Sequence, residues 1–246
     1  MTQQQFLRRD WQHWFEGLPS CTAKHNRGVR VSIDALLSDC LKGGGHHYYP
    51  HIACLGNLPY PLTRHSIGHL ALDALASRLG TQFSSNRALG GLVAQANVTI
   101  GENSVDLTLL KPKALMNISG PLVSKALKQT AKKPSSMIVI YDSLSHKPYA
   151  LSPSFGTSAA GHNGIKSIIT SLGGDLGFHR FRLGIGKNDR DAAEYVLSKL
   201  SQDEINYWGP NGKGSDVAYP FCSHFATSYG HEPPLARYIL VRPSGH

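Results

Sequence analysis

One histidine, one aspartate and three asparagines of this 246-residue chain stand where expected strands end or expected helices begin. They are His65, Asp142, Asn57, Asn117 and Asn163. A carboxylate at a strand end can hydrogen-bond one nitrogen of a histidine, so that the other nitrogen takes a proton from water. Asparagine amides can hold a carbonyl group and donate to a developing oxyanion. Together these residue types predict a hydrolytic site that uses no covalent nucleophile.

Each of these residues also has an ordinary structural explanation. Asp142 could cap a turn, Asn117 could hold a turn, and Asn163 could be a helix N-cap. Met116 could be a core residue, and a histidine near a helix start, such as His65, is commonly structural. The combination of all of them in one chain is what favours a functional site.

An alternation of strand and helix patterns positions these residues. The expected strands are 51–55, 91–98, 105–110, 137–141 and 181–185, and the expected helices are 66–79, 119–131, 163–172 and 189–200. Segments 91–98 and 105–110 are expected to pair as a hairpin around residues 101–103, and a loop region with Pro148, Pro153 and Gly156 is expected to lead to helix 163–172. This order predicts an α/β fold with one domain and a mixed, mostly parallel sheet flanked by helices. Sheets of this class bind ligands beyond the carboxyl ends of their strands, where Asn57 and His65 stand.

The composition bounds the domain organisation and the partners. We expect an N-terminal extension over residues 1–45, a catalytic domain over 46–206 and a divergent C-terminal segment over 207–246. The formal charge of +9 favours an anionic partner, for which nucleic acid is the common choice, although a mildly basic enzyme is the alternative.

The location is predicted from what the sequence lacks. No apolar run has the length of a membrane span, and the N-terminus lacks the apolar core of a secretory signal. The four cysteines stand far apart without a C-x-x-C pair. We therefore expect an intracellular protein, mitochondrial or cytoplasmic, with no membrane association.

Other chemistries fit the sequence less well. It contains no G-x-S-x-G elbow, no P-loop, no G-x-G-x-x-G that opens a helix after the first strand, and no H-E-x-x-H. The thirteen histidines show no metal-ligand spacing, so we expect neither a metal nor a cofactor.

Four motifs, in order, resemble those of the bacterial-type peptidyl-tRNA hydrolases, over roughly residues 50–206. The first resembles the segment GLGNPGxxYxxTRHNxG of that family and reads CLGNLPYPLTRHSIGHLALDALA in this chain. The second resembles LxKPxTFMNxSG and reads LLKPKALMNISG, and Asp142 falls where the family has its strand-ending aspartate. The last resembles GGHNGLKxI…LGxxxFxRxRxGIG and reads AAGHNGIKSIITSLGGDLGFHRFRLGIG. The extension at the N-terminus suggests a eukaryotic or organellar branch.

The resemblance implies hydrolysis of the ester between a peptide and the 3′ end of tRNA. It implies that His65 is the catalytic base, that Asp142 orients it, and that Asn57 helps to position the substrate and the attacking water. The remaining positions carried over are substrate-binding residues: Asn117 and Asn163; Met116 and His162 in the peptide cleft; Tyr60 near the acceptor end of tRNA; and Arg182 at a tRNA phosphate. A monomer is the expected oligomeric state.

The chain also departs from the family pattern. The loop between Asn57 and His65 is two residues shorter than usual, and Ser66 replaces the asparagine that normally follows the histidine. Ser145 stands at the second acidic position after the strand, and Ser152 and Ser154 stand where the family has a basic pair. These departures put the affinity for tRNA in question more than the chemistry.

Three functions are therefore open: an active peptidyl-tRNA esterase, an RNA-binding relative without turnover, and a small-ester hydrolase unrelated to RNA. The five polar residues named first favour the esterase, and the positive charge argues against the small-ester hydrolase.

Overall fold

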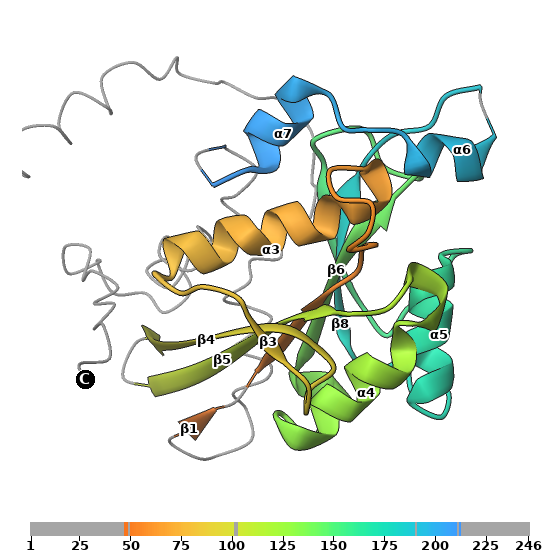
Figure 1. Cartoon of the computed structure of the whole chain (residues 1–246). Coiled ribbons are helices and arrows are strands. Elements are labelled where there is room, and N and C mark those ends of the chain that lie inside the picture. Colours follow the sequence, from red (N-terminus) through yellow and green to blue (C-terminus); the bar gives the residue numbers. More distant parts are fainter. Residues whose placement is uncertain (1–46, 49, 101–102, 190, 211, 213–246) are drawn as a thin grey trace, which may run out of the picture. The chain divides into compact units, whose positions relative to one another are not determined.

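A mixed β-sheet of eight strands runs through the part of the chain that the computed structural model describes, which is residues 47–48, 50–100, 103–189, 191–210 and 212 (Figure 1). The strands are β1 (His47–Tyr48), β2 (His51–Cys54), β3 (Ser84–Asn86), β4 (Gly91–Ile100), β5 (Asn103–Pro112), β6 (Met137–Ser143), β7 (Leu151–Phe155) and β8 (His179–Gly184). The main path through the sheet is β3-β4-β5-β2-β6-β8-β7, and β1 pairs with β5.

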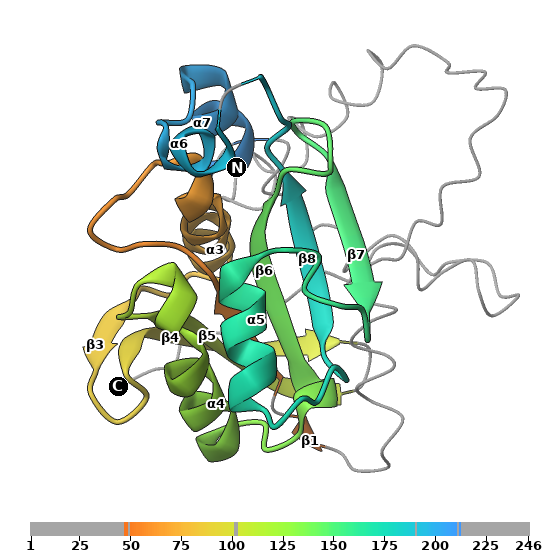
Figure 2. The same ribbon diagram turned by 90° about the vertical axis from the view of Figure 1, so that its right-hand side faces the viewer.

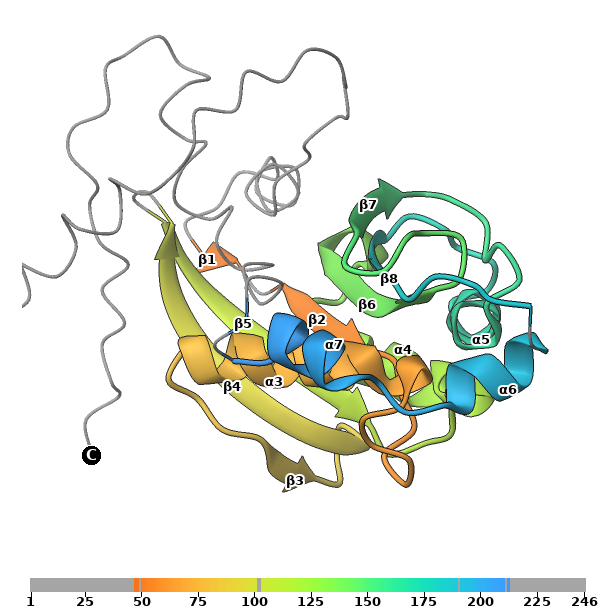
Figure 3. The same cartoon turned by 90° about the horizontal axis from the view of Figure 1, so that it is seen from above.

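The central strands of this sheet are parallel and its outer strands are antiparallel. β2 runs parallel to both β5 and β6, and β6 runs parallel to β8. β3 and β4, β4 and β5, and β7 and β8 pair antiparallel. The expected α/β fold with a mixed sheet is confirmed, and the sheet curls from β3 at one edge to β7 at the other (Figure 3).

Helices cover both faces of the sheet (Figures 1 and 2). They are α3 (Ile67–Arg78), α4 (Gly120–Gln129), α5 (Asn163–Ser171), α6 (Ala192–Leu197) and α7 (Gln202–Trp208), with 3₁₀ turns η2 (Arg64–Ser66), η3 (Met116–Ile118) and η4 (Pro134–Ser136). One core joins the sheet to α3 and α7, where Leu72 and Trp208 are fully buried. A second core joins the opposite face to α4 and α5, through residues such as Val123 and Ile168.

The register of β2 and β6 brings the polar residues of the two strand ends together. Cys54 pairs with Ile140 in the parallel ladder, so Asn57 and Asp142 both stand just beyond that pair. α3 and α5 begin at the same edge, immediately after η2 and after His162. The buried parallel strands thus place one edge of the sheet under the starts of two helices.

The structure corrects two expectations. The expected helix 189–200 is wrong: α6 ends at Leu197, Ser198 has the extended backbone angles φ −68° and ψ 152°, and α7 begins four residues later. The expected loop region with Pro148, Pro153 and Gly156 contains strand β7. β7 lies at the edge of the sheet. Pro153 is tolerated there because an edge strand has a neighbouring strand on one side only, so fewer of its backbone N–H groups are needed for the sheet.

Other expectations differ only at element boundaries or lie outside the described residues. The hairpin of β4 and β5 is confirmed, since the two strands pair from Gly91 to Ile100, whereas residues 101–102 of its turn are outside the described part. The extension 1–45 and nearly all of the segment 207–246 are also outside it, and the domain boundaries stay predictions. Among the described residues, no helix combines the length and apolarity needed to cross a membrane.

Candidate active site

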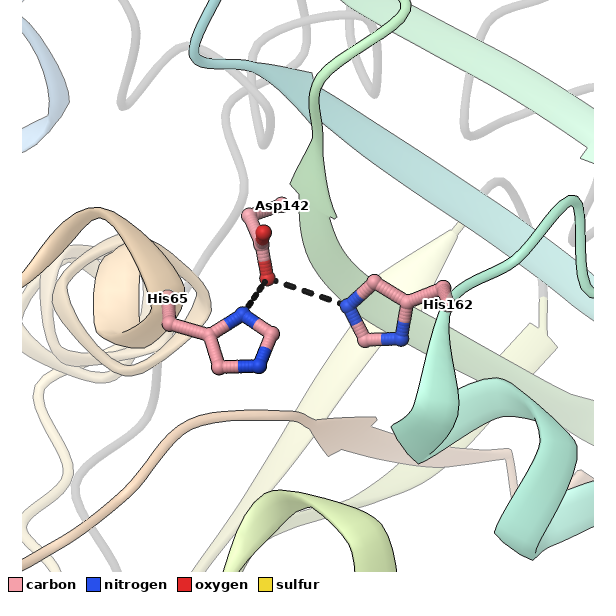
Figure 4. A group of neighbouring side chains, drawn as sticks. All are labelled: His65, Asp142 and His162. Atoms are coloured by element: carbon pink, nitrogen blue, oxygen red, sulfur yellow. Dashed lines mark hydrogen bonds and ion pairs between the residues drawn. The ribbon is translucent and has the colours of Figure 1, made fainter. Parts of the chain in front are cut away.

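Three side chains from three different elements meet at the carboxyl end of β6 (Figure 4). His65 in η2 places Nδ1 2.8 Å from Oδ1 of Asp142, and His162, just before α5, places Nε2 3.1 Å from the same oxygen. The two imidazole centroids are 5.3 Å apart. The side chain of Asp142 is only 2% exposed, against 16% for His65 and 11% for His162. A buried carboxylate oxygen therefore lies between two partly accessible imidazoles.

Asp142 is ionised in this environment. Burial alone raises the pKa of its carboxyl group, but the interactions with His162 and His65, the hydrogen bonds among them, lower that pKa further than burial raises it. The net effect holds the pKa of Asp142 well below its usual range. An ionised carboxylate only accepts hydrogen bonds, so both imidazole nitrogens that face it carry protons.

The hydrogen bonds also fix which nitrogen of each neutral imidazole is unprotonated. Nδ1 of His65 donates to Asp142, which leaves Nε2 unprotonated and without a hydrogen-bond partner among the described residues. His162 has the opposite arrangement, because its Nδ1 accepts the backbone N–H of Ile165 at 3.3 Å. His162 is the N-cap of α5, and its Nε2 is therefore the nitrogen that donates to Asp142.

The same three residues are the candidate metal ligands of the described part of the chain. Their ligand atoms lie within 4.8 Å of one another. A metal ion at this position would have to replace both hydrogen bonds that now satisfy the buried carboxylate of Asp142. The hydrogen bonds of this donor set suit proton transfer, and the absence of a metal stays a prediction.

Asn57 and Ser66 hold the short loop that leads to His65. The Asn57 side chain is buried, and its Oδ1 accepts the backbone N–H of Met116 at 2.8 Å. Because a backbone N–H can only donate, Nδ2 is the Asn57 atom that remains to donate elsewhere. The hydroxyl of Ser66 accepts the backbone N–H of Asn57 at 3.0 Å and donates to the carbonyl oxygen of Tyr60 at 2.8 Å. Ser66, a departure from the family pattern, thus closes this shortened loop.

Asn117 and Asn163 stand at the starts of α4 and α5, and both are exposed. Close contact between these helices sets their spacing, because Gly120 donates its backbone N–H to Oγ of Ser167 at 3.0 Å. Met116 is 4% exposed and belongs to the second core, where its sulfur lies against Gly164. The structure thus brings the two asparagines to one rim and places Met116 beneath it.

Tyr60 and Arg182 lie outside the histidine-aspartate cluster. The Tyr60 ring is 56% exposed in the loop before η2. Arg182 in β8 donates from Nη2 to Oγ of Ser152 at 2.8 Å and from Nε to the carbonyl oxygen of Ser152 at 3.3 Å. Ser152 is one of the two positions where the family has a basic residue, so here the serine holds the arginine instead of adding a charge.

Sequence reasoning missed two relationships in the site. It placed His162 only in the peptide cleft, which stays a prediction, and did not foresee that this residue binds Asp142 and caps α5. It also gave no role to Arg64, whose guanidinium contacts residues 134 to 140 positions later in the chain. Part of the second relationship could have been found, because Ser201 and Glu204 have the spacing of a capping box and mark the start of a separate helix.

The chain is similar to known proteins over the region that carries this site. A family model described as peptidyl-tRNA hydrolase matches residues 51–211. A peptidyl-tRNA hydrolase of Clostridium botulinum is 38% identical over 152 residues, which cover 61% of this chain and 77% of that protein. One of Caulobacter vibrioides is 35% identical over 176 residues, which cover 70% of this chain and 84% of that protein.

Solved structures that resemble this chain come from the same family. The crystal structure of peptidyl-tRNA hydrolase from Acinetobacter baumannii aligns with a TM-score of 0.58 and 25% identity, covering 72% of this chain and 91% of that one. An Arg119Gln mutant of the enzyme from the same organism aligns with a TM-score of 0.55. Motifs, sheet topology and relatives agree, and the chain belongs to the peptidyl-tRNA hydrolase family.

Proposed function

We propose that this chain hydrolyses the ester bond between peptide and tRNA in peptidyl-tRNA, with His65 as the general base. One observation carries the assignment of the base. Nδ1 of His65 donates to the ionised Asp142 at 2.8 Å, which leaves Nε2 unprotonated at a partly accessible position. An unprotonated imidazole nitrogen in this orientation can take a proton from water, and Asp142 stabilises the imidazolium that forms.

The reaction follows from this arrangement. Nε2 of His65 removes a proton from a water molecule as the water oxygen attacks the ester carbonyl carbon. The tetrahedral intermediate carries an oxyanion, and Nδ2 of Asn57 is a fixed amide donor for it because Oδ1 is held by Met116. Collapse of the intermediate breaks the bond to the 3′ oxygen of the tRNA, which receives the proton from His65. The products are a free peptide and a free tRNA.

Asn117 and Asn163 are suited to hold the peptide. Both amides are exposed at the rim beside Asp142, at the starts of α4 and α5, and neither has a hydrogen-bond partner in the part of the chain that is described. An amide side chain can donate to one peptide carbonyl group and accept from one peptide N–H. This property favours a substrate whose acyl group is a peptide.

A tRNA partner agrees with the distribution of charge. Residues 107–174 contain eight lysines and one acidic residue, which is the buried Asp142. The exposed ring of Tyr60 can stack on a terminal base, and Arg182 can contact a phosphate. We further propose a monomer, located in mitochondria or cytoplasm, and light scattering during gel filtration tests the first of these.

The decisive assay is release of labelled peptide from a tRNA that carries an N-acetylated amino acid. Hydrolysis of this substrate, with slow hydrolysis of the unblocked aminoacyl-tRNA and of a small phenyl ester, is the expected result. Binding of the tRNA without release would instead identify an RNA-binding relative. Equal rates on the phenyl ester would identify a small-ester hydrolase.

A further inference from the structure

The segment between α6 and α7 is attached to the turn that carries His65. Ser198–Ser201, which we call the strap, runs extended beside the residues before His65. The backbone N–H of Arg64 donates to the carbonyl oxygen of Ser198 at 2.9 Å, and that of Leu200 donates to the carbonyl oxygen of Leu62 at 2.8 Å. Thr63 and Lys199, which lie between these two hydrogen bonds, form an isolated antiparallel β-bridge.

The side chain of Arg64 strengthens this attachment. Its Nη1 donates to Oγ of Ser198 at 2.8 Å and to the carbonyl oxygen of Lys199, and its Nη2 donates to Oε2 of Glu204 at 2.9 Å. The guanidinium lies over the ring of Tyr195, 4.8 Å from its centroid. One side chain therefore contacts the end of α6, the strap and the first turn of α7.

Glu204 is committed to this contact. Its side chain is 7% exposed, and Oε2 also accepts the backbone N–H of Ser201 at 2.7 Å. α6, which leads into the strap, is fixed to the chain just after β8, because the hydroxyl of Tyr195 donates to the carbonyl oxygen of Ile185 at 2.6 Å. Removal of one member of this largely buried ion pair would leave the other charge without its ionic partner.

The turn that carries His65 needs external support. η2 is only three residues long, and a single 3₁₀ turn has little stability of its own. Leu62 just before it has a φ of 58°, a strained conformation for a residue with a side chain. Ser66 anchors the turn on one side of His65, and Arg64 anchors it on the other.

We propose that Arg64 and Glu204 are positioning residues that hold His65 in hydrogen-bond register with Asp142. The proposal rests on the proposed function, because it takes His65 as the base. Glu204 is buried, and Arg64 is turned toward the strap, so neither needs to touch the substrate. Displacement of a catalytic group by about 1 Å is enough to reduce a rate on the order of 100-fold. Loss of the ion pair should therefore reduce kcat and leave KM nearly unchanged.

The test compares Glu204→Gln and Arg64→Lys with the matched control Asp203→Asn, a neighbouring exposed acidic residue of α7 outside the ion pair. With N-acetylated aminoacyl-tRNA, we expect kcat of Glu204→Gln to fall about tenfold or more, and KM and the affinity for deacylated tRNA to stay within about twofold. Arg64→Lys should keep more activity than Arg64→Met. NMR should show the downfield Nδ1 proton of His65 shifted or broadened in the impaired variants only.

A second step separates positioning from folding. The double variant Arg64→Met/Glu204→Gln should lose no more kcat than the worse single variant, since both changes break one pair. Unchanged kcat in folded Glu204→Gln would overturn the proposal, and so would a kcat loss with an unperturbed His65 Nδ1 proton. A rise in KM alone would overturn it in favour of a substrate contact. Inactivity of the wild-type chain in the same assay would instead contradict the proposed function.

Discussion

His162 and Asp142 are joined by a hydrogen bond of 3.1 Å from Nε2 to Oδ1, while the other ring nitrogen of the histidine accepts a backbone N–H of α5. This arrangement ties the orientation of the buried carboxylate to the start of a helix that also carries Asn163. His162 and His65 are not hydrogen-bonded to each other, but both bind the same carboxylate oxygen of Asp142. We expect the two histidines to have different functions, and substitution can separate them.

His65→Ala should reduce kcat by roughly 100-fold or more, because the proton acceptor for water is lost. His162→Gln should reduce kcat less, by about tenfold, because glutamine can still donate to Asp142 but cannot also cap α5 in the same geometry. Single-turnover rates on N-acetylated aminoacyl-tRNA measure both effects. His146→Gln is the control, since that residue bonds Ser143 rather than Asp142. Equal losses for the His65 and His162 variants would contradict this division of roles.

Two buried histidines outside the cluster of His65, Asp142 and His162 should make stability depend on pH. Burial lowers the pKa of His51 to about 4, and burial together with the charge of Lys111 lowers that of His69 to about 3. An unfolded histidine titrates near 6.5, so below that pH the unfolded chain binds more protons than the folded one. The free energy of unfolding should therefore fall as the pH falls from about 6.5 to about 4, by on the order of a few kcal/mol for each residue.

Urea unfolding at several pH values tests this dependence. His69→Gln should reduce the slope of unfolding free energy against pH over that range, because one of the two proton sites is gone. Lys166→Gln, an exposed change on α5, should leave the slope unchanged. A slope that is identical in the wild type and in His69→Gln would show that His69 does not titrate on unfolding.

The close packing of α4 against α5 gives a third prediction. A Cβ added at Gly120 would lie 2.0 Å from the backbone oxygen of Ser167, whereas one added at Gly164 would lie 2.5 Å from the flexible side chain of Met116. Gly120→Ala should therefore lower the free energy of unfolding more than Gly164→Ala does, with a difference on the order of 1–3 kcal/mol. It should also raise KM, because the spacing of Asn117 and Asn163 depends on these helices. Equal unfolding free energies of the two variants would contradict the packing argument.

Most of the sheet and the core of the site could be predicted from sequence, and the reasons are local. The apolar runs of β2 and β6 end in polar residues, and the helices after them have clear starts, so Asn57, His65 and Asp142 were expected near one another. What could not be predicted depends on distant partners. The helical pattern over 189–200 is broken at Ser198 because the strap pairs with Thr63 and Arg64, more than 130 residues earlier.

Strand β7 and the hydrogen bond between His162 and Asp142 were also missed. β7 is short and contains Pro153 between two serines, a composition typical of a loop, and its pairing with β8 makes it a strand. The bond from His162 to Asp142 was missed because the resemblance placed His162 in the peptide cleft, and because Asn163 rather than His162 was considered as the N-cap of the following helix.

Proton transfer without a metal ion is the fourth prediction. The imidazole nitrogens of His65 and His162 that would share a metal ion with Asp142 already donate hydrogen bonds to the carboxylate of Asp142. Treatment with a chelator and dialysis should therefore leave kcat unchanged once the magnesium needed by the tRNA is restored. Loss of activity that returns with zinc but not with magnesium would show that these residues bind a metal during turnover.

The last prediction concerns the phosphate contacts. Because Ser152 occupies two donor atoms of Arg182 and adds no charge, we expect a shallow dependence of tRNA affinity on salt. Ser152→Lys should free Nη2 of Arg182, which now donates to the Ser152 hydroxyl, and add a cation, and Ser154→Lys should add another, so each should steepen the slope of log Kd against log salt by about 1. Arg182→Ala should raise KM more than it lowers kcat, because it removes binding shared by substrate and transition state. The measurement compares tRNA with and without a 5′ phosphate across salt concentrations. Strong discrimination for the 5′ phosphate in the wild type that persists in Arg182→Ala would place the phosphate contact on other residues.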